Sequence, residues 1–261
     1  SPDVPASHTT KTTTLGAAGA IQGDPSTAYD FAGQTSGSRV YTAAQLPDQQ
    51  EFAAEAWIKT STNSGGRIIG FSNGTSGNSG KSDRHVYMRN DGKLSFGVMG
   101  DSMQTVTSTA SYNDDKFHHV VAQMSVNGME LFVDGAKVAS NPSAYAAIEY
   151  NAYWRIGGDG LAGWPGRPSS DYFAGTIDEV ALYTQALTPS RVAHHRLSGL
   201  GVPNQPPTAL FSATLNNMAV SFNASGSTDP DGSISSYAWD FGDGQSGSGV
   251  TASHVYASPG S

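Results

Sequence analysis

The sequence predicts an all-β protein of two domains, and three observations support this interpretation. The chain of 261 residues contains 31 glycines and 13 prolines, whereas charged residues make up only 14%. This composition favours a turn-rich β protein over a coiled coil or a helical bundle. Short segments of alternating apolar and polar residues recur between turn signals, as in β-strands. A stiff PNQPP segment at 203–207 separates a long first part from a short second one.

The first clear strand lies at residues 51–60. Apolar residues occupy every second position from Phe52 to Ile58, which is the period of a strand with one buried face. Residues 85–98 alternate in the same way on both sides of an Asn-Asp-Gly turn at 90–92. This second segment therefore predicts a hairpin.

Residues 117–140 carry the strongest hairpin signals of the chain. Asn127-Gly128 and Asp134-Gly135 each separate two alternating segments, and such pairs supply the positive φ angles of a type I′ turn. The region therefore predicts three consecutive antiparallel strands. Further short strands are expected at 154–157 and 175–183.

One helix is expected, at residues 187–197. Thr188 can cap its first turn, Pro189 suits the first helical position, and Val192 and Leu197 supply a small apolar face. So short a helix is expected to pack against the edge of a sheet.

The domain organisation follows from these segments. Residues 1–19 are rich in Ser, Thr, Ala and Gly and are interpreted as a linker or an irregular lead-in. The first domain is predicted at 20–201, the proline-rich linker at 202–207 and the second domain at 208–261. Because the last segment holds only two or three good strands, we expect the second domain to be incomplete at its carboxyl end.

Composition excludes several functional classes. The formal net charge is -8, and residues 204–261 contain no Lys or Arg, whereas nucleic-acid binding needs clustered basic side chains. No window approaches 18 consecutive apolar residues, so no membrane insertion is expected. The absence of cysteine excludes disulfides, thiolate catalysis and cysteine-based zinc sites. No feature of the sequence indicates an oligomeric state.

Three motifs resemble one family of β-sandwiches. They are AYDFAGQ at 28–34, HHVVAQMSVNGMELFVDGAKVAS at 118–140 and FAGTIDEVALYTQALTPSRVAHHR at 173–196. All three resemble laminin G-like, concanavalin A-like jelly-roll domains, in the expected order and spacing. The resemblance implies a concanavalin A-like jelly-roll sandwich over about residues 20–200.

The second part resembles a different β-sandwich. PPTALFSA at 206–213, GSTDPDGSISSYAWDFGDG at 226–244 and HVYASPG at 254–260 resemble a PKD domain, an immunoglobulin-like fold of extracellular bacterial proteins. Trp239 and Phe241 alternate with Asp240, so the two aromatic rings are expected to face the core of this domain.

Catalytic signatures are absent from the sequence. There is no G-x-S-x-G elbow, and the paired carboxylates of glucanases with the concanavalin A-like fold have no counterpart. Glu51 and Glu55 share one strand face with Trp57 and Lys59, which favours an exposed rim over a cleft. His118 and His119 are neighbours on a strand and are expected to point to opposite faces. We therefore predict that this chain is not an enzyme.

The resemblance implies a structural calcium ion. Asp178, in the GTIDEV strand, is the matching carboxylate, Gly23 and Asp24 are the matching carbonyl and carboxylate near the amino end, and Asp30 is a further candidate. Calcium prefers such oxygen ligands. The alternative is an ordinary aspartate at a strand edge. The Asp-Pro-Asp-Gly sequence at 229–232 lacks the spacing of an EF-hand and is interpreted as a turn.

Two groups of side chains are candidates for ligand binding, because sugar sites combine aromatic platforms with a few polar groups. The first is the stripe formed by His85, Tyr87 and Arg89. The second lies in the segment 154–173. The alternative for both groups is packing over the mouth of the sandwich. The members of the second group are Trp154, Trp164, Arg167 and Tyr172.

These observations together predict a secreted or cell-surface, non-catalytic binding module, stabilised by calcium, whose partner is a glycan or an extracellular surface component. Two alternatives remain open. The pair of domains could serve as accessory modules of a larger secreted polysaccharide-degrading enzyme, or as a structural spacer or adhesin stalk without a small ligand.

Overall fold

The computed structural model describes residues 6–9, 13–21, 23–33 and 39–258. The chain divides into two compact units, Ser1–Gly201 and Val202–Ser261, and each is described by itself. The predicted all-β class is confirmed, because strands dominate both units. No helix in the described part of the chain is long and apolar enough to cross a membrane.

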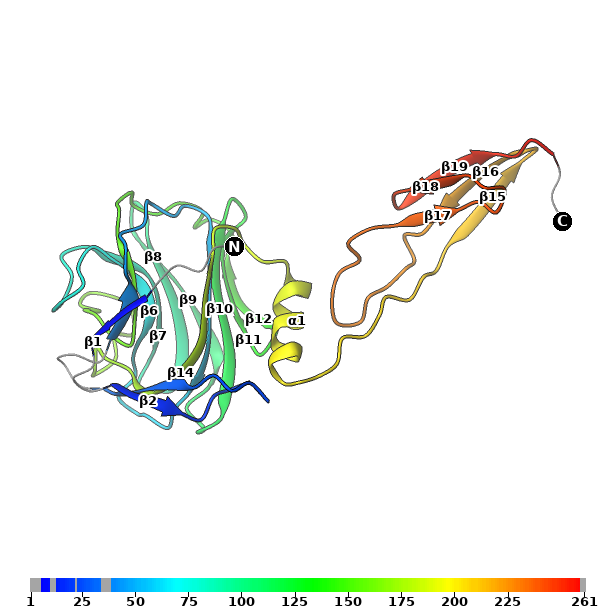
Figure 1. Ribbon diagram of the computed structural model, residues 1–261. Helices are drawn as coiled ribbons and strands as arrows, with labels where there is room; N and C mark the ends of the chain where they lie inside the picture. Colours follow the sequence, from blue (N-terminus) through cyan, green and yellow to red (C-terminus); the bar gives the residue numbers. More distant parts are fainter. Residues whose placement is uncertain (1–5, 10–12, 22, 34–38, 259–261) are drawn as a thin grey trace. The chain divides into compact units, whose positions relative to one another are not determined.

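The first unit is a sandwich of two antiparallel sheets that face each other (Figure 1). The first sheet contains, in spatial order, β1 (Ala6–Thr9), β4 (Arg39–Thr42), β13 (Tyr153–Ile156), β6 (Gly66–Ser72), β7 (Ser82–Met88), β8 (Lys93–Met99) and β9 (Met103–Ser111). The second sheet contains β12 (Ala136–Asn141), β11 (Gly128–Val133), β10 (Phe117–Ser125), β5 (Phe52–Lys59), β14 (Ala174–Tyr183), β3 (Ala28–Ala32) and β2 (Thr13–Ala17).

The core lies between the inner faces of the two sheets. The alternation predicted for β5 is confirmed, because its apolar residues at every second position from Phe52 to Ile58 belong to this core. Phe52 and Phe71 both contact Trp154, with ring centroids 5.3 Å apart in each pair. Inward-facing side chains of both sheets thus form one continuous apolar layer.

The three-stranded region β10–β11–β12 is confirmed, but its first turn differs from the prediction. Ser125 pairs with Gly128, and of the residues around this turn only Gly128 has a positive φ, 98°. The turn is therefore not of type I′; a glycine just after the turn, in this conformation, is typical of a glycine bulge. Asp134 and Gly135, with φ of 52° and 79°, have the predicted type I′ pattern.

The helix α1 (Pro189–Gly199) covers part of the outer face of the second sheet (Figure 1). The oxygen of the Thr188 side chain accepts a hydrogen bond from the Arg191 backbone N–H, as the predicted cap requires. Leu187 and Val192 pack in one cluster with Ala53, Val121 and Phe132 of the sheet. Among the described residues this is the only α-helix.

The outer face of the first sheet is covered by a loop instead. Leu161 and Trp164, within the loop at 157–173, form a small apolar cluster with Tyr87 of β7. The Tyr87 hydroxyl donates to the Pro165 carbonyl at 2.5 Å. Both outer faces of the sandwich are therefore partly buried.

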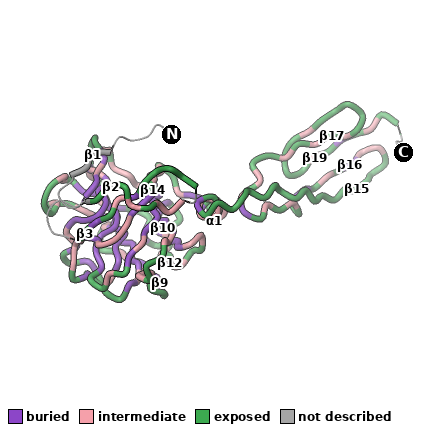
Figure 2. The backbone as a smooth tube through the Cα atoms, turned by 60° about the horizontal axis from the view of Figure 1, so that its bottom comes forward, coloured by how far each residue is buried: buried purple, intermediate pink, exposed green. Residues whose placement is uncertain are grey.

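The second unit consists of two small sheets. One contains β15 (Ser212–Asn216), β16 (Ala219–Asn223) and β19 (Thr251–Val255), and the other contains β17 (Ala238–Asp240) and β18 (Ser246–Ser248). Trp239 and Phe241 both lie near Phe222, with ring centroids 5.3 and 5.6 Å away. The neighbouring Phe211 remains 59% exposed, and most of this unit is exposed (Figure 2). The predicted inward direction of the aromatic rings is confirmed, although their cluster is open to solvent.

Candidate functional site

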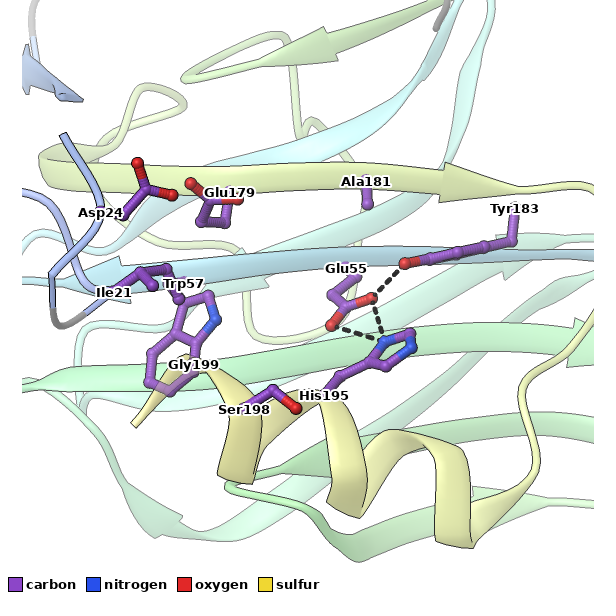
Figure 3. A pocket seen from close by; sticks show the side chains of 10 residues that line it. All are labelled: Ile21, Asp24, Glu55, Trp57, Glu179, Ala181, Tyr183, His195, Ser198 and Gly199. Carbon is purple, nitrogen blue, oxygen red and sulfur yellow. Dashed lines mark hydrogen bonds and ion pairs between the residues drawn. The ribbon is translucent and has the colours of Figure 1, made fainter. Parts of the chain in front are cut away.

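A pocket of about 330 Å³ opens beside α1 on the outer face of the second sheet (Figure 3). Its walls come from four parts of the chain: the segment before β3, the strands β5 and β14, and the helix α1. The lining residues are Ile21, Asp24, Glu55, Trp57, Glu179, Ala181, Tyr183, His195, Ser198 and Gly199.

The floor of the pocket comes from β5, where Glu55 and Trp57 alternate with core residues. Glu55 is 6% exposed and Trp57 is 3% exposed. The expectation of an exposed rim is therefore wrong at these two positions, because α1 packs over them. At Gly199 a Cβ atom would lie 2.5 Å from the Trp57 ring, which shows how closely the end of the helix approaches the indole. Glu51 is exposed as predicted.

Four hydrogen bonds hold the Glu55 carboxylate. Its Oε1 accepts from His119 Nε2 at 2.6 Å and from His195 Nδ1 at 3.1 Å. Its Oε2 accepts from the Tyr183 hydroxyl at 2.8 Å and from His195 Nδ1 at 3.0 Å. These contacts join β5, β10, β14 and α1 through a single side chain, and Figure 3 shows those with Tyr183 and His195.

The charge of Glu55 is stabilised by these donors. Burial raises the pKa of a carboxyl group, but the hydrogen bonds from His119 and His195 outweigh it and lower the pKa of Glu55 to about 2. Glu55 is therefore ionised at neutral pH. With both oxygens occupied, it serves as an anchor for the helix.

The two adjacent histidines of β10 point to opposite faces, as predicted. The ring of His119 lies 5.2 Å from that of Trp57, on the face covered by α1. His118 contacts Asp114 at 2.9 Å and Asp134 at 2.8 Å instead. Burial lowers the pKa of His118, but the two aspartates outweigh it and raise that pKa above its ordinary value.

Carboxylates without a basic partner gather at the other end of the pocket. Asp178 Oδ2 accepts a hydrogen bond from the Ala20 backbone N–H at 2.7 Å. At Gly19 a Cβ atom would lie 2.9 Å from the same oxygen, so this glycine permits the close approach. Asp24 and Glu179 lie side by side at the pocket wall (Figure 3). Among the described residues, no Lys, Arg or His forms an ion pair with any of the three acids.

The position of Glu179 is unusual. It has a φ of 48° and lies where the register of β14 against β5 shifts, between Asp178 and Ala181. Burial raises the pKa of Glu179, and the charges of Asp178, Asp24 and Glu55 raise it further, against the effect of a hydrogen bond from Ser26. Negative charge therefore accumulates here without a compensating cation.

These residues fit the donor set of a hard cation. Asp24 and Asp178 supply carboxylate oxygens on adjoining segments, and the backbone carbonyl of Gly23 belongs to the same loop. No three acidic or histidine groups of the described residues already converge on one point, so backbone carbonyls or water would have to complete the coordination. Asp30 lies elsewhere: its side chain contacts Thr176 at 3.4 Å and lines a separate pocket with Lys59.

The predicted ligand stripe on β7 is mostly buried. His85 and Tyr87 are both 0% exposed, and the His85 ring lies 4.6 Å from Trp164, edge to face. The alternation correctly separated this face from the core, but the loop 157–173 covers it. Only Arg89, at the end of the strand, has a side chain accessible to solvent.

The members of the second predicted ligand-binding group, in the segment 154–173, do not lie together on one accessible surface. Trp154 lies in the core between the sheets. Trp164 and Tyr172 belong to the loop, where they were expected to be accessible to a ligand, but both are buried. Arg167 is accessible and forms an ion pair with Asp171 at 2.9 Å. The alternative of packing over the sandwich is thus the better description of Trp164 and Tyr172, whereas Trp154 is a core residue.

Sequence reasoning missed the network around Glu55. A signal was available, since His119 is the direct cross-strand neighbour of Trp57 and His195 belongs to the predicted helix. What the sequence could not supply was the docking of that helix on this particular face.

Comparisons with known proteins agree with this architecture. A family model described as the concanavalin A-like lectin/glucanases superfamily matches residues 32–193, and a model described as the PKD domain matches residues 204–261. A curated relative, collagenase ColQ1 of Bacillus cereus (strain Q1), is 37% identical over 73 residues, which cover 27% of this chain and 8% of that protein. The chain thus matches only a small part of this relative.

Two solved structures are similar to parts of this chain. The binding domain of botulinum neurotoxin serotype G has a TM-score of 0.51 at 9% identity, over 75% of this chain and 47% of that chain. The CBM40 domain of the Ruminococcus gnavus IT-sialidase has a TM-score of 0.44 at 19% identity, over 56% of this chain and 82% of that chain. At such identities the likeness concerns the fold alone.

Proposed function

Because this chain belongs to the concanavalin A-like lectin/glucanases superfamily and carries a PKD domain behind it, we propose that it is a non-catalytic binding module. Its ligand is a carbohydrate, and the pocket beside α1 is the binding site. The volume of about 330 Å³ is at the small end for ligand sites, which suits one sugar residue better than a long oligosaccharide.

The observation that carries this proposal is the indole of Trp57. Its ring is almost completely buried, it lines the pocket, and its N–H has no hydrogen-bond acceptor among the described residues. Figure 3 shows the indole nitrogen turned toward the space between Trp57 and Glu55. The nitrogen is not closed off from the pocket, so its hydrogen-bond acceptor has to come from water or from a ligand. A ligand oxygen would supply it.

The remaining polar groups of the pocket complement hydroxyl groups. Asp24 and Glu179 are acceptors on the opposite wall, and the Ser198 hydroxyl can donate or accept. A sugar hydroxyl both donates and accepts, so it can bridge the Trp57 donor and the carboxylate acceptors. An apolar ligand would offer none of these groups a hydrogen bond.

Catalysis by the same pocket is disfavoured by the state of Glu55. Retaining glycosidases need one carboxylate free to attack and a second, protonated carboxyl group close to it. Glu179, with its raised pKa, could act as the acid. Glu55 could not act as the nucleophile, because both of its oxygens are held by His119, His195 and Tyr183.

We include a structural calcium ion in the proposal. Asp178, Asp24 and the Gly23 carbonyl would hold it, with Glu179 as an additional carboxylate, and Asp30 is left out because it faces another pocket. The accumulation of unpaired negative charge at Asp178 and Glu179 supports the site. When bound, the ion neutralises this charge and ties the segment before β3 to β14.

The setting that we propose is extracellular, on a secreted or cell-surface protein, with a glycan or another surface component as partner. The similarity of part of the chain to a collagenase favours a second function, that of an accessory module in a larger secreted enzyme. Both functions need the pocket to bind and need no catalysis in this chain.

A glycan array followed by titration calorimetry tests the proposal. Trp57→Phe removes the N–H together with part of the buried indole, so we expect at least a tenfold loss of affinity and a modest fall of the melting temperature, which is measured separately. The matched control is Trp239→Phe, since the Trp239 N–H already donates to Gly249 in the second unit. Failure of the wild-type chain to bind any array glycan, or equal binding by Trp57→Phe, would contradict the proposal.

A further inference from the structure

Three arginines are buried on the outer face of the first sheet. Arg39, Arg67 and Arg155 belong to the neighbouring strands β4, β6 and β13, and their exposed fractions are 7%, 0% and 0%. Arg155 pairs in register with Gly70 of β6. At Gly70 a Cβ atom would lie 2.6 Å from Arg67 Nε, so the missing side chain leaves room for the Arg67 guanidinium next to Arg155.

The loop at 73–81, between β6 and β7, lies over these guanidinium groups. Arg39 Nε donates to the Thr75 carbonyl at 3.0 Å. Arg155 Nη1 donates to the Gly74 carbonyl at 3.1 Å and to Ser79 Oγ at 2.8 Å. Both arginines thus converge on the same short, glycine-rich loop.

Negative charge is scarce around them. Asp159 Oδ2 lies 3.1 Å from Arg67 Nη1 and 2.8 Å from Arg155 Nη1, and this single carboxylate serves both. The next acids are already paired, Asp83 with Arg84 and Asp171 with Arg167. The cluster of three arginines and one aspartate therefore carries an excess of positive charge in a buried place.

Several N–H groups of the cluster have no partner. Arg39 Nη1, Arg67 Nε and Arg155 Nε are buried and lack any hydrogen-bond acceptor among the described residues. Buried polar groups are normally paired, and a buried charge without a partner is strongly destabilising. The cluster therefore lacks acceptors as well as negative charge.

The pKa shifts of Arg155 and His85 agree with an excess of positive charge in this cluster. Burial lowers the pKa of Arg155 to about 10, since the opposing effect of Asp159 is partly cancelled by the charges of Arg67 and Arg39. Burial, followed by the charge of Arg67, also keeps the pKa of His85 well below its ordinary value. A further positive charge is disfavoured here and a negative one is favoured.

Arg84, on the same strand β7 as His85, shows that the deficit is local. It is equally buried, yet it has two carboxylates, Asp83 at 2.6 Å and Asp48 at 2.7 Å, and a carbonyl acceptor in Gln49. We infer that Arg39, Arg67 and Arg155 form a binding site for a small oxyanion, which the loop 73–81 covers. Guanidinium groups bind carboxylate, sulfate and phosphate groups with paired hydrogen bonds.

This site is separate from the pocket beside α1 and does not depend on the function proposed for it. The oxyanion could be a free inorganic ion or the carboxylate of an acidic sugar. The loop must lift for it to enter, and the loop is exposed over most of its length and contains Gly74, Gly77 and Gly80. Sulfate serves as the probe for a free inorganic ion, and glucuronate serves as the probe for the carboxylate of an acidic sugar.

The test is thermal denaturation of the whole chain in buffer of low ionic strength, with millimolar sulfate, glucuronate or neutral glucose. At a hundredfold excess over Kd we expect the melting temperature to rise by roughly 5–10 °C. Arg39→Gln should remove most of this rise, because Arg39 Nη1 is one of the unpaired donors. The control Arg167→Gln, a change at an accessible arginine, should keep it.

A second variant keeps the test decisive if Arg39→Gln fails to fold. Asp159→Asn removes the one internal carboxylate, so its melting temperature should respond more strongly to the anion than that of the wild type. A larger response to glucuronate than to sulfate identifies a carboxylate-bearing ligand, and a larger response to sulfate, or a response to sulfate alone, identifies an inorganic oxyanion. No response in the wild type, or a response that Arg39→Gln and Asp159→Asn leave unchanged, would overturn the inference.

Discussion

The two outer faces of the sandwich bury opposite charges, and they compensate them differently. On the second sheet Glu55 is covered by α1, and donors from His119, His195 and Tyr183 fill both carboxylate oxygens. On the first sheet three arginines are covered by loops, and their many N–H groups outnumber the acceptors. A carboxylate is small enough to be satisfied by three side chains, whereas a group of guanidiniums needs more acceptors than one aspartate and a short loop can provide.

The difference teaches that an opposite charge alone is not enough for a buried charge, which also needs enough hydrogen-bond partners. Against the effect of burial, hydrogen bonds from His119 and His195, followed by the charge interactions with the same two rings, hold the pKa of Glu55 at about 2. The arginines have a carboxylate and still keep unpaired donors.

The largest effect is expected from Glu55→Ala. It would leave His119 and Tyr183 without their shared acceptor and would detach His195 from the sheet. We expect the free energy of unfolding to fall by about 3–5 kcal/mol, as for other broken buried networks. Urea denaturation measures it. Glu51→Ala, at an exposed position of the same parity, is the control and should change stability by less than about 0.5 kcal/mol.

The pH dependence of stability isolates the charge of Glu55. Its pKa is lowered from 4.5 to about 2 on folding, so its contribution is fully present above pH 4.5 and is lost as the pH falls toward 2. The difference corresponds to about 3 kcal/mol. Urea denaturation between pH 5 and pH 2 should therefore show a steeper acid loss for the wild type than for Glu55→Gln. If the unfolding free energies of the wild type and Glu55→Gln fall in parallel with pH, the charge of Glu55 does not provide this stabilisation.

Calcium removal tests the acidic end of the same face. If the ion binds the folded chain only, it stabilises by about 2.7 kcal/mol at a hundredfold excess over Kd, so chelator should lower the melting temperature by roughly 5–10 °C. Asp178→Ala should abolish this response, and Asp229→Ala in the second unit should leave it intact. A wild-type melting curve that chelator does not move would exclude the ion and leave Asp178 as a partner of Ala20 only.

The smallest effect is expected from Tyr183→Phe, which removes one of the donors to Glu55. Burial and the Glu55 charge raise the pKa of Tyr183, so its hydroxyl is a donor throughout the accessible pH range. We expect a loss of about 1 kcal/mol, with a Glu55 pKa closer to its ordinary value, measured by NMR titration. An unchanged pKa would mean that the histidines alone hold the charge.

The sequence predicted the fold well because strand period and turn residues are local properties. The alternation from Phe52 to Ile58 and the Asp134-Gly135 turn are each readable within a few residues. The cap at Thr188 is equally local, and the structure has all three. The turn type predicted for the first turn of the 117–140 region was wrong, because Gly128 follows this turn instead of lying within it.

The candidate site was less predictable because exposure depends on segments distant in the chain. Alternation correctly placed His85 and Tyr87 away from the core, but the loop that buries them begins some 70 residues later. Glu55 was expected on a rim for the same reason, since α1 covers it from the far end of the domain. Strand period assigns a residue to a face, and only tertiary packing decides whether that face is covered.

The anchoring of α1 has a mechanical consequence. The helix is the last element of the first unit, and the chain runs from it directly into the second unit. A force that pulls on the second unit therefore reaches the sandwich through α1. The contact of His195 with Glu55, together with Leu187 and Val192 in their apolar cluster, resists peeling of the helix from the sheet. This attachment is therefore part of the resistance of the first unit to a pull on the second.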